Sequence, residues 1–133
     1  MQKKYRLKSS RVFNYLHKKG ISSANKRLVL VHAQSKYPLK VGFIVSKKVG
    51  KAVVRNKVRR RLREIFRALI PYLEDNCNYI IIARTECANS TFSQLADSMA
   101  SILSKAGKLT KPIDREVGAR LSLNEKFLSL QNS

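Results

Sequence analysis

The spacing of apolar residues along the chain predicts an alternation of helices and strands. Apolar positions three or four residues apart indicate one buried helix face, whereas short apolar runs rich in Val and Ile indicate buried strands. Helices are expected from Ser9 or Ser10 to about Lys19, from the Val49-Gly50 turn to near Ile70, and over Ser93–Lys105. Strands are expected over Arg27–His32, Val41–Ser46 and Tyr79–Ala83.

The order helix, strand, strand, helix, strand, helix predicts an α+β fold. The expected architecture is a small antiparallel or mixed sheet of about four strands with helices packed on it, including one β-α-β unit around the middle helix. We expect residues 1–108 to form this domain. Residues 109–133 form a tail whose weak apolar pattern is compatible with a short helix or a loosely ordered segment. That pattern comprises Val117, Leu121, Leu123, Phe127 and Leu128.

The middle helix combines an apolar stripe with a high density of positive charge. The stripe that we expect to be buried comprises Val54, Val58, Leu62, Ile65, Phe66 and Leu69. The opposite, exposed face is expected to hold Asn56, Arg60, Arg63 and Arg67, flanked by Arg59 on one side and by Lys57 and Arg61 on the other. Like charges four residues apart repel each other by a few tenths of a kcal/mol per pair. A chain that keeps so many of them favours a polyanionic partner.

Positive charge is concentrated in the first half of the chain. The formal net charge is +20; residues 1–67 hold 21 Lys or Arg and one acidic residue, whereas residues 68–133 hold seven of each sign. Such charge favours nucleic acid or an anionic membrane. Basic amphipathic helices also bind membranes or partner helices, but here the flanking strands need the apolar face for the core. We therefore predict an RNA-binding protein, because Arg, Lys and Asn along a helix can grip phosphates without reading sequence.

Other features narrow the class of protein. No apolar run approaches the roughly 18 residues of a membrane span, and no apolar segment follows the basic N-terminus as in a secretory signal. Two cysteines, Cys77 and Cys87, are too few for a disulfide framework and favour a reduced, cytoplasmic protein. Metal-dependent phosphodiester cleavage needs clustered carboxylates, and the basic half holds only Glu64. The sequence thus predicts no catalytic residue and no metal site on the polypeptide.

Four segments carry a more specific pattern. They are LKSSRVFNYLHKKG near the N-terminus, VGFIVSKKVGKAV, the Arg-Asn helix RNKVRRRLREIFR at 55–67, and YIIIAR. An extended VSKK, a short glycine turn and an Arg-Asn helix in succession are far more specific than a basic helix alone. Over residues 3–108 the chain resembles the bacterial ribonuclease P protein subunit family.

This resemblance implies a function and a set of partners. The family's protein joins a large catalytic RNA that removes the 5′ leader of precursor tRNA, so the expected partners are that RNA and precursor tRNA, with one protein per RNA. Mg²⁺ is the implied cofactor, and the RNA is expected to bind it. The protein is then a subunit of a cytoplasmic endoribonuclease and is expected to be inactive alone. The resemblance also implies a left-handed β-α-β crossover, whereas general rules favour a right-handed one.

The resemblance assigns binding roles by position. The residues expected to face the catalytic RNA are Lys47, Lys48, Lys51, Arg55, Asn56, Lys57, Arg59, Arg60, Arg63 and Arg67. The residues expected to line a cleft for the leader are Phe13, His17, Val29, Val31, Ile44 and Ser46. For the four apolar members of the second set, ordinary core packing is the alternative.

Two positions depart from the family pattern. Lys57 stands in place of an arginine, so a bidentate grip on phosphate becomes a point charge. His17 stands where the family commonly has a second aromatic residue, one turn after Phe13.

The main alternative function is a ribosomal or RNA-assembly protein with a purely structural role, and a free-standing nuclease is the second.

Overall fold

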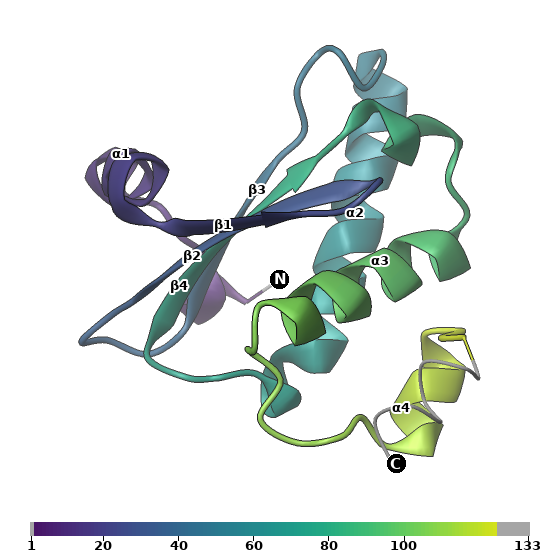
Figure 1. Cartoon of the computed structure of the whole chain (residues 1–133). Helices are drawn as coiled ribbons and strands as arrows, with labels where there is room; N and C mark the ends of the chain where they lie inside the picture. The colour runs from purple at the N-terminus through teal and green to yellow at the C-terminus, as the bar shows by residue number, and fades with distance from the viewer. Residues whose placement is uncertain (1, 125–133) are drawn as a thin grey trace.

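The computed structural model describes residues 2–124 and confirms the α+β class. A four-stranded mixed sheet carries helices on both faces (Figure 1). The α-helices are α1 Ser10–Lys19, α2 Ala52–Leu69, α3 Phe92–Lys105 and α4 Arg115–Arg120. The strands are β1 Ile21–Ala24, β2 Leu28–Gln34, β3 Lys40–Ile44 and β4 Cys77–Ala83. Short 3-10 helices occur at η1 Lys3–Tyr5, η2 Ile70–Tyr72 and η3 Thr85–Asn89.

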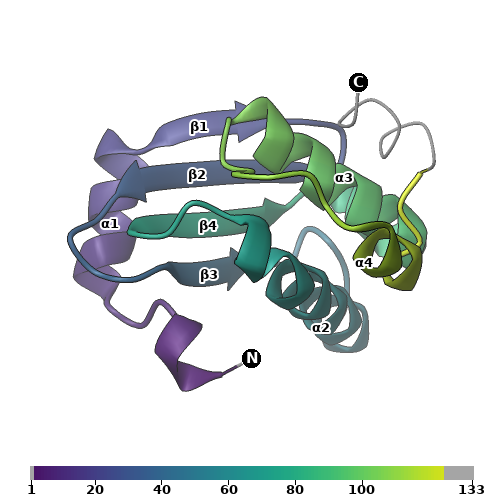
Figure 2. The same ribbon diagram turned by 90° about the horizontal axis from the view of Figure 1, so that it is seen from below.

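The strands lie side by side in the order β1-β2-β4-β3. β2 is antiparallel to both β1 and β4, whereas β3 is parallel to β4. The helix α2 therefore joins two neighbouring parallel strands, which is the predicted β-α-β unit. Figure 2 views the sheet with α2 and α3 in front and shows that the crossover is left-handed, as the family resemblance implied.

One face of the sheet, which we call the α2–α3 face, is covered by α2 and α3 and holds the larger core. Leu62, Phe66 and Tyr79 are fully buried there. The ring of Phe66 meets Phe43 and Tyr79 edge to face, with centroid separations of 5.9 and 5.7 Å. Such contacts add to the stability gained by burial and fix the angle at which α2 packs.

The other face, which we call the α1 face, is crossed by α1 alone (Figure 2). The Oγ of Ser9 accepts a hydrogen bond from the N–H of Val12 at 3.4 Å and caps the helix, as expected. Leu16 is fully buried against the sheet. At Gly20 a Cβ atom would lie 2.6 Å from Cγ1 of Val31, so only glycine lets the chain turn this tightly from α1 into β1.

Several strand and helix boundaries differ from the sequence-based expectation. β3 ends at Ile44 rather than Ser46, because the chain turns there and the N–H of Val49 donates to the carbonyl of Ser46 at 3.1 Å. β2 and β4 are longer than expected, since the two strands continue pairing to Gln34 opposite Cys77. β2 also begins one residue later than expected, and α3 one residue earlier.

The strand β1 was not predicted at all. Its sequence, ISSA, shows no alternation of apolar and polar residues, and Ile21 is exposed. It becomes a strand because the turn after Ala24 returns the chain as β2, which pairs Ile21 with His32 and Ala24 with Val29. Pairing with a neighbouring strand, and not local pattern, creates this edge of the sheet.

The residues that follow α3 also pack on the domain. Ile113, Leu121 and Leu123 are buried in the same cluster as the residues of α2 and α3. The predicted apolar positions Phe127 and Leu128 lie outside the described residues. The larger core therefore extends beyond α3, and α4 lies on the side of the molecule remote from α1 (Figure 1).

Candidate nucleic-acid interface

The helix α2 presents the predicted basic face. Its apolar stripe is buried at Val58, Leu62, Ile65, Phe66 and Leu69, and Val54 in the first turn is half-buried. Of the ten residues expected to face RNA, the exposed ones are Lys47, Lys48, Lys51, Asn56, Lys57, Arg60 and Arg67. The half-buried ones are Arg55, Arg59 and Arg63. All ten side chains therefore retain contact with solvent, which is a condition for binding a polyanion.

Two neighbouring side chains on α2 are held in place by a hydrogen bond between them. Nη1 of Arg59 donates a hydrogen bond to Oδ1 of Asn56, one turn earlier, at 3.1 Å. The Nε of Arg55 is buried, and no described group accepts a hydrogen bond from it. A buried donor without a partner is costly, so an anion that reached this nitrogen would gain a strong contact. Arg61 points toward the domain instead, where its Nη1 donates to the carbonyl of Ser90 at 3.4 Å.

Arg63 lies where α2 passes the β3 edge of the sheet. It lines a small hollow of about 150 Å³ with Arg6, Phe13 and Gly42 among its neighbours. Burial lowers the pKa of Arg63, and the charges of Arg59 and Arg6 lower it further. Arginine remains protonated in proteins, so the three guanidinium groups repel one another. A bound anion would relieve that repulsion.

The loop between β3 and α2 is anchored by two apolar side chains, since Val45 and Val49 are both buried in the larger core. Val49 is 5% exposed in the larger core, and its N–H donates to the carbonyl of Ser46. Lys47 and Lys48 lie between these two anchored residues and are exposed. The loop therefore places two exposed lysines shortly after the end of β3.

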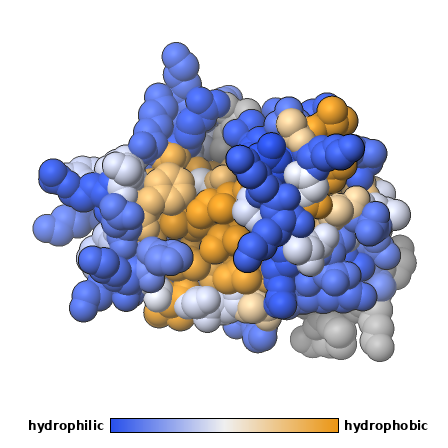
Figure 3. All heavy atoms as spheres, turned by 90° about the horizontal axis from the view of Figure 1, so that it is seen from above, coloured by the Kyte–Doolittle hydropathy of each residue, from blue (hydrophilic) through white to orange (hydrophobic). Residues whose placement is uncertain are grey.

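Beside α1 the sheet leaves apolar side chains in contact with solvent. The strand register places Val29, Ile82 and Ile44 in one row across β2, β4 and β3, and we call this row the apolar strip. Val29 and Ile82 are half-buried and Ile44 is 37% exposed. Figure 3 shows a hollowed apolar area on this side of the molecule, with hydrophilic side chains on both flanks. Apolar surface bordered by cations suits the bases and phosphates of an unpaired strand.

Phe13 lies over β3 because Gly42 leaves room for its ring. A Cβ on Gly42 would collide with Cζ of Phe13. The ring packs against the smaller core and is half-buried, so part of its surface remains available. His17, one turn further along α1, is exposed. The two residues therefore lie on the same helix, with the aromatic ring nearer to the sheet.

The six residues expected to line the leader cleft occupy three kinds of environment. Val31 is 8% exposed beneath α1 and acts mainly as core. Phe13, Val29 and Ile44 are in part accessible, and His17 and Ser46 are exposed. Sequence reasoning missed Ile82, which lies between Val29 and Ile44 in the apolar strip. In the run YIIIA, successive side chains alternate between the two faces of the sheet, and this was the available signal. The alternation does not show which of the two faces remains uncovered by a helix.

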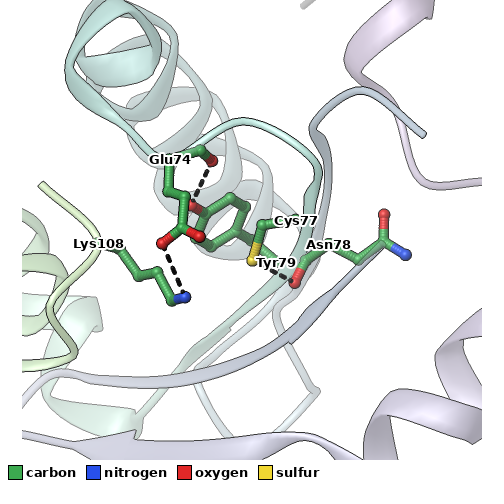
Figure 4. A network of polar contacts seen from close by, with 5 residues as sticks. All are labelled: Glu74, Cys77, Asn78, Tyr79 and Lys108. Atoms are coloured by element: carbon green, nitrogen blue, oxygen red, sulfur yellow. Dashed lines mark hydrogen bonds and ion pairs between the residues drawn. The ribbon is translucent and has the colours of Figure 1, made fainter. Parts of the chain in front are cut away.

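Besides Arg63, several titratable groups with shifted pKa values lie within the domain on the α2–α3 face and have structural roles. Figure 4 shows the hydroxyl of Tyr79 donating to the carbonyl of Glu74 at 2.8 Å, and the ammonium of Lys108 paired with the Glu74 carboxylate at 3.1 Å. Burial raises the pKa of Tyr79 and of Cys77. Burial, with the charge of Lys108 adding to it, lowers the pKa of His32. These groups stay neutral inside the domain, away from the basic surface.

The described part of the chain contains no group of three or more His, Cys, Asp or Glu side chains that could hold a metal ion. Within residues 2–124, no helix has the length and apolar character required to cross a membrane. The chemistry that the described surface offers is binding of anions and of flat apolar groups.

Comparisons with known proteins agree with this arrangement. The Ribonuclease P family model matches residues 1–107. The ribonuclease P protein component of Symbiobacterium thermophilum is 39% identical over 114 residues, which cover 84% of this chain and 98% of that protein. The component from Geobacillus thermodenitrificans is 38% identical over 114 residues, covering 84% of this chain and 93% of that protein.

Solved structures show the same relationship. The RNase P protein of Staphylococcus aureus superimposes with a TM-score of 0.74 at 34% identity, covering 79% of this chain and 97% of that one. The RNase P protein of Thermotoga maritima gives a TM-score of 0.69 at 27% identity, covering 75% of this chain and 96% of that one. From the family model, the sequence relatives and the fold together, the chain belongs to the ribonuclease P protein family.

Proposed function

We propose that this protein is the protein subunit of a bacterial ribonuclease P, and that it holds both the catalytic RNA and the 5′ leader of precursor tRNA. Family membership supports the role in maturation of the tRNA 5′ end. The observation that carries the finer proposal is that one domain presents two separate surfaces. A cationic helix face suits phosphates, and an apolar strip beside α1 suits unpaired bases.

The outer face of α2 is the surface that we assign to the catalytic RNA. Its side chains project from a helix whose opposite stripe is buried from Val58 to Leu69, so the backbone that carries them is fixed before RNA binds. Each phosphate that a Lys or Arg neutralises releases counterions, which makes binding steeply dependent on salt. Because these contacts carry no base readout, shape and phosphate spacing would determine which RNA binds. We propose one protein per RNA.

The apolar strip is the surface that we assign to the leader. Phe13 offers a partly exposed ring for stacking, and Lys47 and Lys48 stand at the end of β3 where they can meet phosphates. Stacking of an aromatic ring on an unpaired base is worth about 1–3 kcal/mol. Mature tRNA lacks the leader, so this contact would favour precursor over product.

We propose that the RNA, and not the polypeptide, carries out the cleavage and binds the Mg²⁺ ions that it requires. Two features support this: the basic half of the sequence holds a single carboxylate, Glu64, and the described donor groups do not fit a metal site. The protein then contributes by screening repulsion between two RNA molecules. We place this complex in the cytoplasm, where the two unpaired cysteines would remain reduced.

The test is cleavage of precursor tRNA by purified protein, by the cognate RNA, and by both together at low Mg²⁺. We expect no cleavage with protein alone and efficient 5′ cleavage with the two combined. The double variant Arg60→Gln/Arg63→Gln should raise the protein concentration needed for cleavage. Its matched control is Lys105→Gln/Arg115→Gln, which removes the same charge from α3 and α4. Site-specific cleavage by RNA-free protein would refute the proposal.

A further inference from the structure

The N-terminal segment, residues 3–9, is fixed along the outer edge of β3. The N–H of Leu7 donates to the carbonyl of Val41 at 2.9 Å, and Arg6 forms a β-bridge with the same residue. Nζ of Lys40 donates to the carbonyl of Lys4 at 2.9 Å. Leu7 is 6% exposed in the smaller core. The backbone of the segment is therefore anchored at several points while its charged side chains remain outside.

This segment, the start of α1 and the loop between β2 and β3 enclose a hollow of about 320 Å³. The cations that line it are Lys3, Arg6, Lys8 and Lys40. Tyr37 also lines it and is 71% exposed. The N–H of Tyr37 donates to Oγ of Ser35 at 3.0 Å, which orders the loop that carries the ring. The hollow thus combines four positive charges with an accessible aromatic ring, the combination that binds unpaired RNA.

The hollow is continuous with the basic face of α2. Arg6 lines both this hollow and the smaller one that Arg63 lines at the β3 edge. Arg63 in turn shares the outer surface of α2 with Arg60, Arg67 and one carboxylate, Glu64. Among the described residues that line the two hollows there is no carboxylate to interrupt the positive charge. A single cationic surface therefore passes from α2 around the edge of the sheet to Tyr37.

The hollow is separate from the apolar strip. Asn78 and Lys40, which line the hollow, pair with each other across β4 and β3. Ile82 and Ile44 of the strip pair four residues further along the same strands. Four residues of extended chain span about 13 Å. The ring of Phe13 lies over Gly42, between the two rows, so α1 stands between the hollow and the strip.

We propose that the N-terminal segment and Tyr37 form a second contact site for the catalytic RNA. An unpaired stretch of that RNA would place phosphates on Arg6 and Lys8 and one base on the ring of Tyr37. This inference rests on the proposed function, since α2 is the surface from which the contact continues. Continuity with α2 favours the catalytic RNA over the leader, because a leader seated on the apolar strip would have to pass across α1 to reach the hollow.

The test measures affinity of each variant for the isolated catalytic RNA, without tRNA, over a series of KCl concentrations. The variants are Arg6→Gln/Lys8→Gln and Tyr37→Ala, compared with Arg60→Gln/Arg63→Gln on α2 and with the control Lys105→Gln/Arg115→Gln. We expect the Arg6/Lys8 variant to bind at least about tenfold more weakly at low salt. Its log–log salt slope should be flatter by roughly one unit for each phosphate that the variant no longer neutralises. Tyr37→Ala should weaken binding about tenfold with an unchanged slope, because stacking releases no counterions.

The remaining outcomes separate the two proposals. If the α2 variant loses affinity while the Arg6/Lys8 and Tyr37 variants match the control, this inference is wrong and the proposed function stands. If the α2 variant also matches the control, the proposed RNA surface itself is wrong. A loss that appears only with precursor tRNA present would assign the hollow to the leader and overturn the inference. Unfolding midpoints of all variants show whether each remains folded.

Discussion

The two faces of the sheet are built from alternate residues of the same strands, yet they differ in how completely the rest of the chain covers them. In β4, Tyr79 and Ile81 point into the α2–α3 face and are fully buried, whereas Ile80 and Ile82 point to the α1 face. Ile80 is covered by α1, but Ile82 is only half-buried. Two long helices and the residues after α3 cover the first face, and one ten-residue helix crosses the second.

This difference between the faces shows how the fold acquires an apolar binding surface. Alternation along each strand makes both faces apolar, and the shorter cover leaves part of one face in water. Each Å² of apolar surface removed from water contributes about 25 cal/mol of stabilising free energy. A partner that covers the apolar strip would therefore gain binding free energy from surface that folding leaves exposed. A contiguous patch of exposed apolar side chains on a protein surface often marks an interaction site.

The neighbouring residues Ile81 and Ile82 test the difference between the faces most strongly. Ile81→Ala should destabilise the protein by about 2–5 kcal/mol, because it opens a cavity in the larger core. Ile82→Ala should cost clearly less, since that side chain is already partly hydrated. Denaturant unfolding of the two variants measures both losses. Equal losses would mean that the α1 face is as closed in solution as the α2–α3 face.

Phe13→Ala tests whether the α1 face serves binding. The substitution should weaken the affinity of the holoenzyme for precursor tRNA by the equivalent of about 1–3 kcal/mol, through loss of stacking on a base. Affinity for mature tRNA should hardly change, since it has no leader. Both affinities are measured by equilibrium titration with reconstituted holoenzyme. Parallel losses for precursor and mature tRNA would assign Phe13 to the core or to the catalytic RNA.

Gly42→Ala tests how Phe13 is positioned. The added Cβ collides with the ring, so the ring must move or the strand must shift, at a cost of about 1–3 kcal/mol. Precursor affinity should fall as well, but less than in Phe13→Ala. In the double variant the stability cost of the added methyl group should largely disappear, because the ring it strikes is gone. Additive stability losses would show that Gly42 is needed for another reason.

The smallest expected effect concerns the pH dependence of stability. Burial lowers the pKa of His32 in the folded protein, so folding favours the neutral imidazole. The unfolded chain then binds more protons, and the free energy of unfolding should decline as pH falls below about 6.5. Measured between pH 7.5 and 5, the decline should be smaller in His32→Gln, while the exposed His17→Gln serves as the control. An identical decline in wild type and His32→Gln would assign the pH dependence to other groups.

Much of the fold could be predicted from the sequence, because its causes are local. The period of apolar residues in α2 fixes which side of the helix is buried, and the cations between them must then face outward. The caps of α1 and the runs of Val and Ile likewise placed the elements to within a few residues. The family resemblance supplied the left-handed crossover, which no local pattern encodes.

Only the tertiary structure decided which apolar residues stay accessible and which cations act together. Val29, Ile82 and Ile44 form one row because three strands from distant parts of the chain pair in one register. Arg6 and Arg63 line one hollow because the N-terminal segment follows the edge of β3 to α2. Periodicity tells each residue which face of its own element it occupies. Coverage of that face depends on the length and position of elements elsewhere in the chain, and this is settled only when the elements pack.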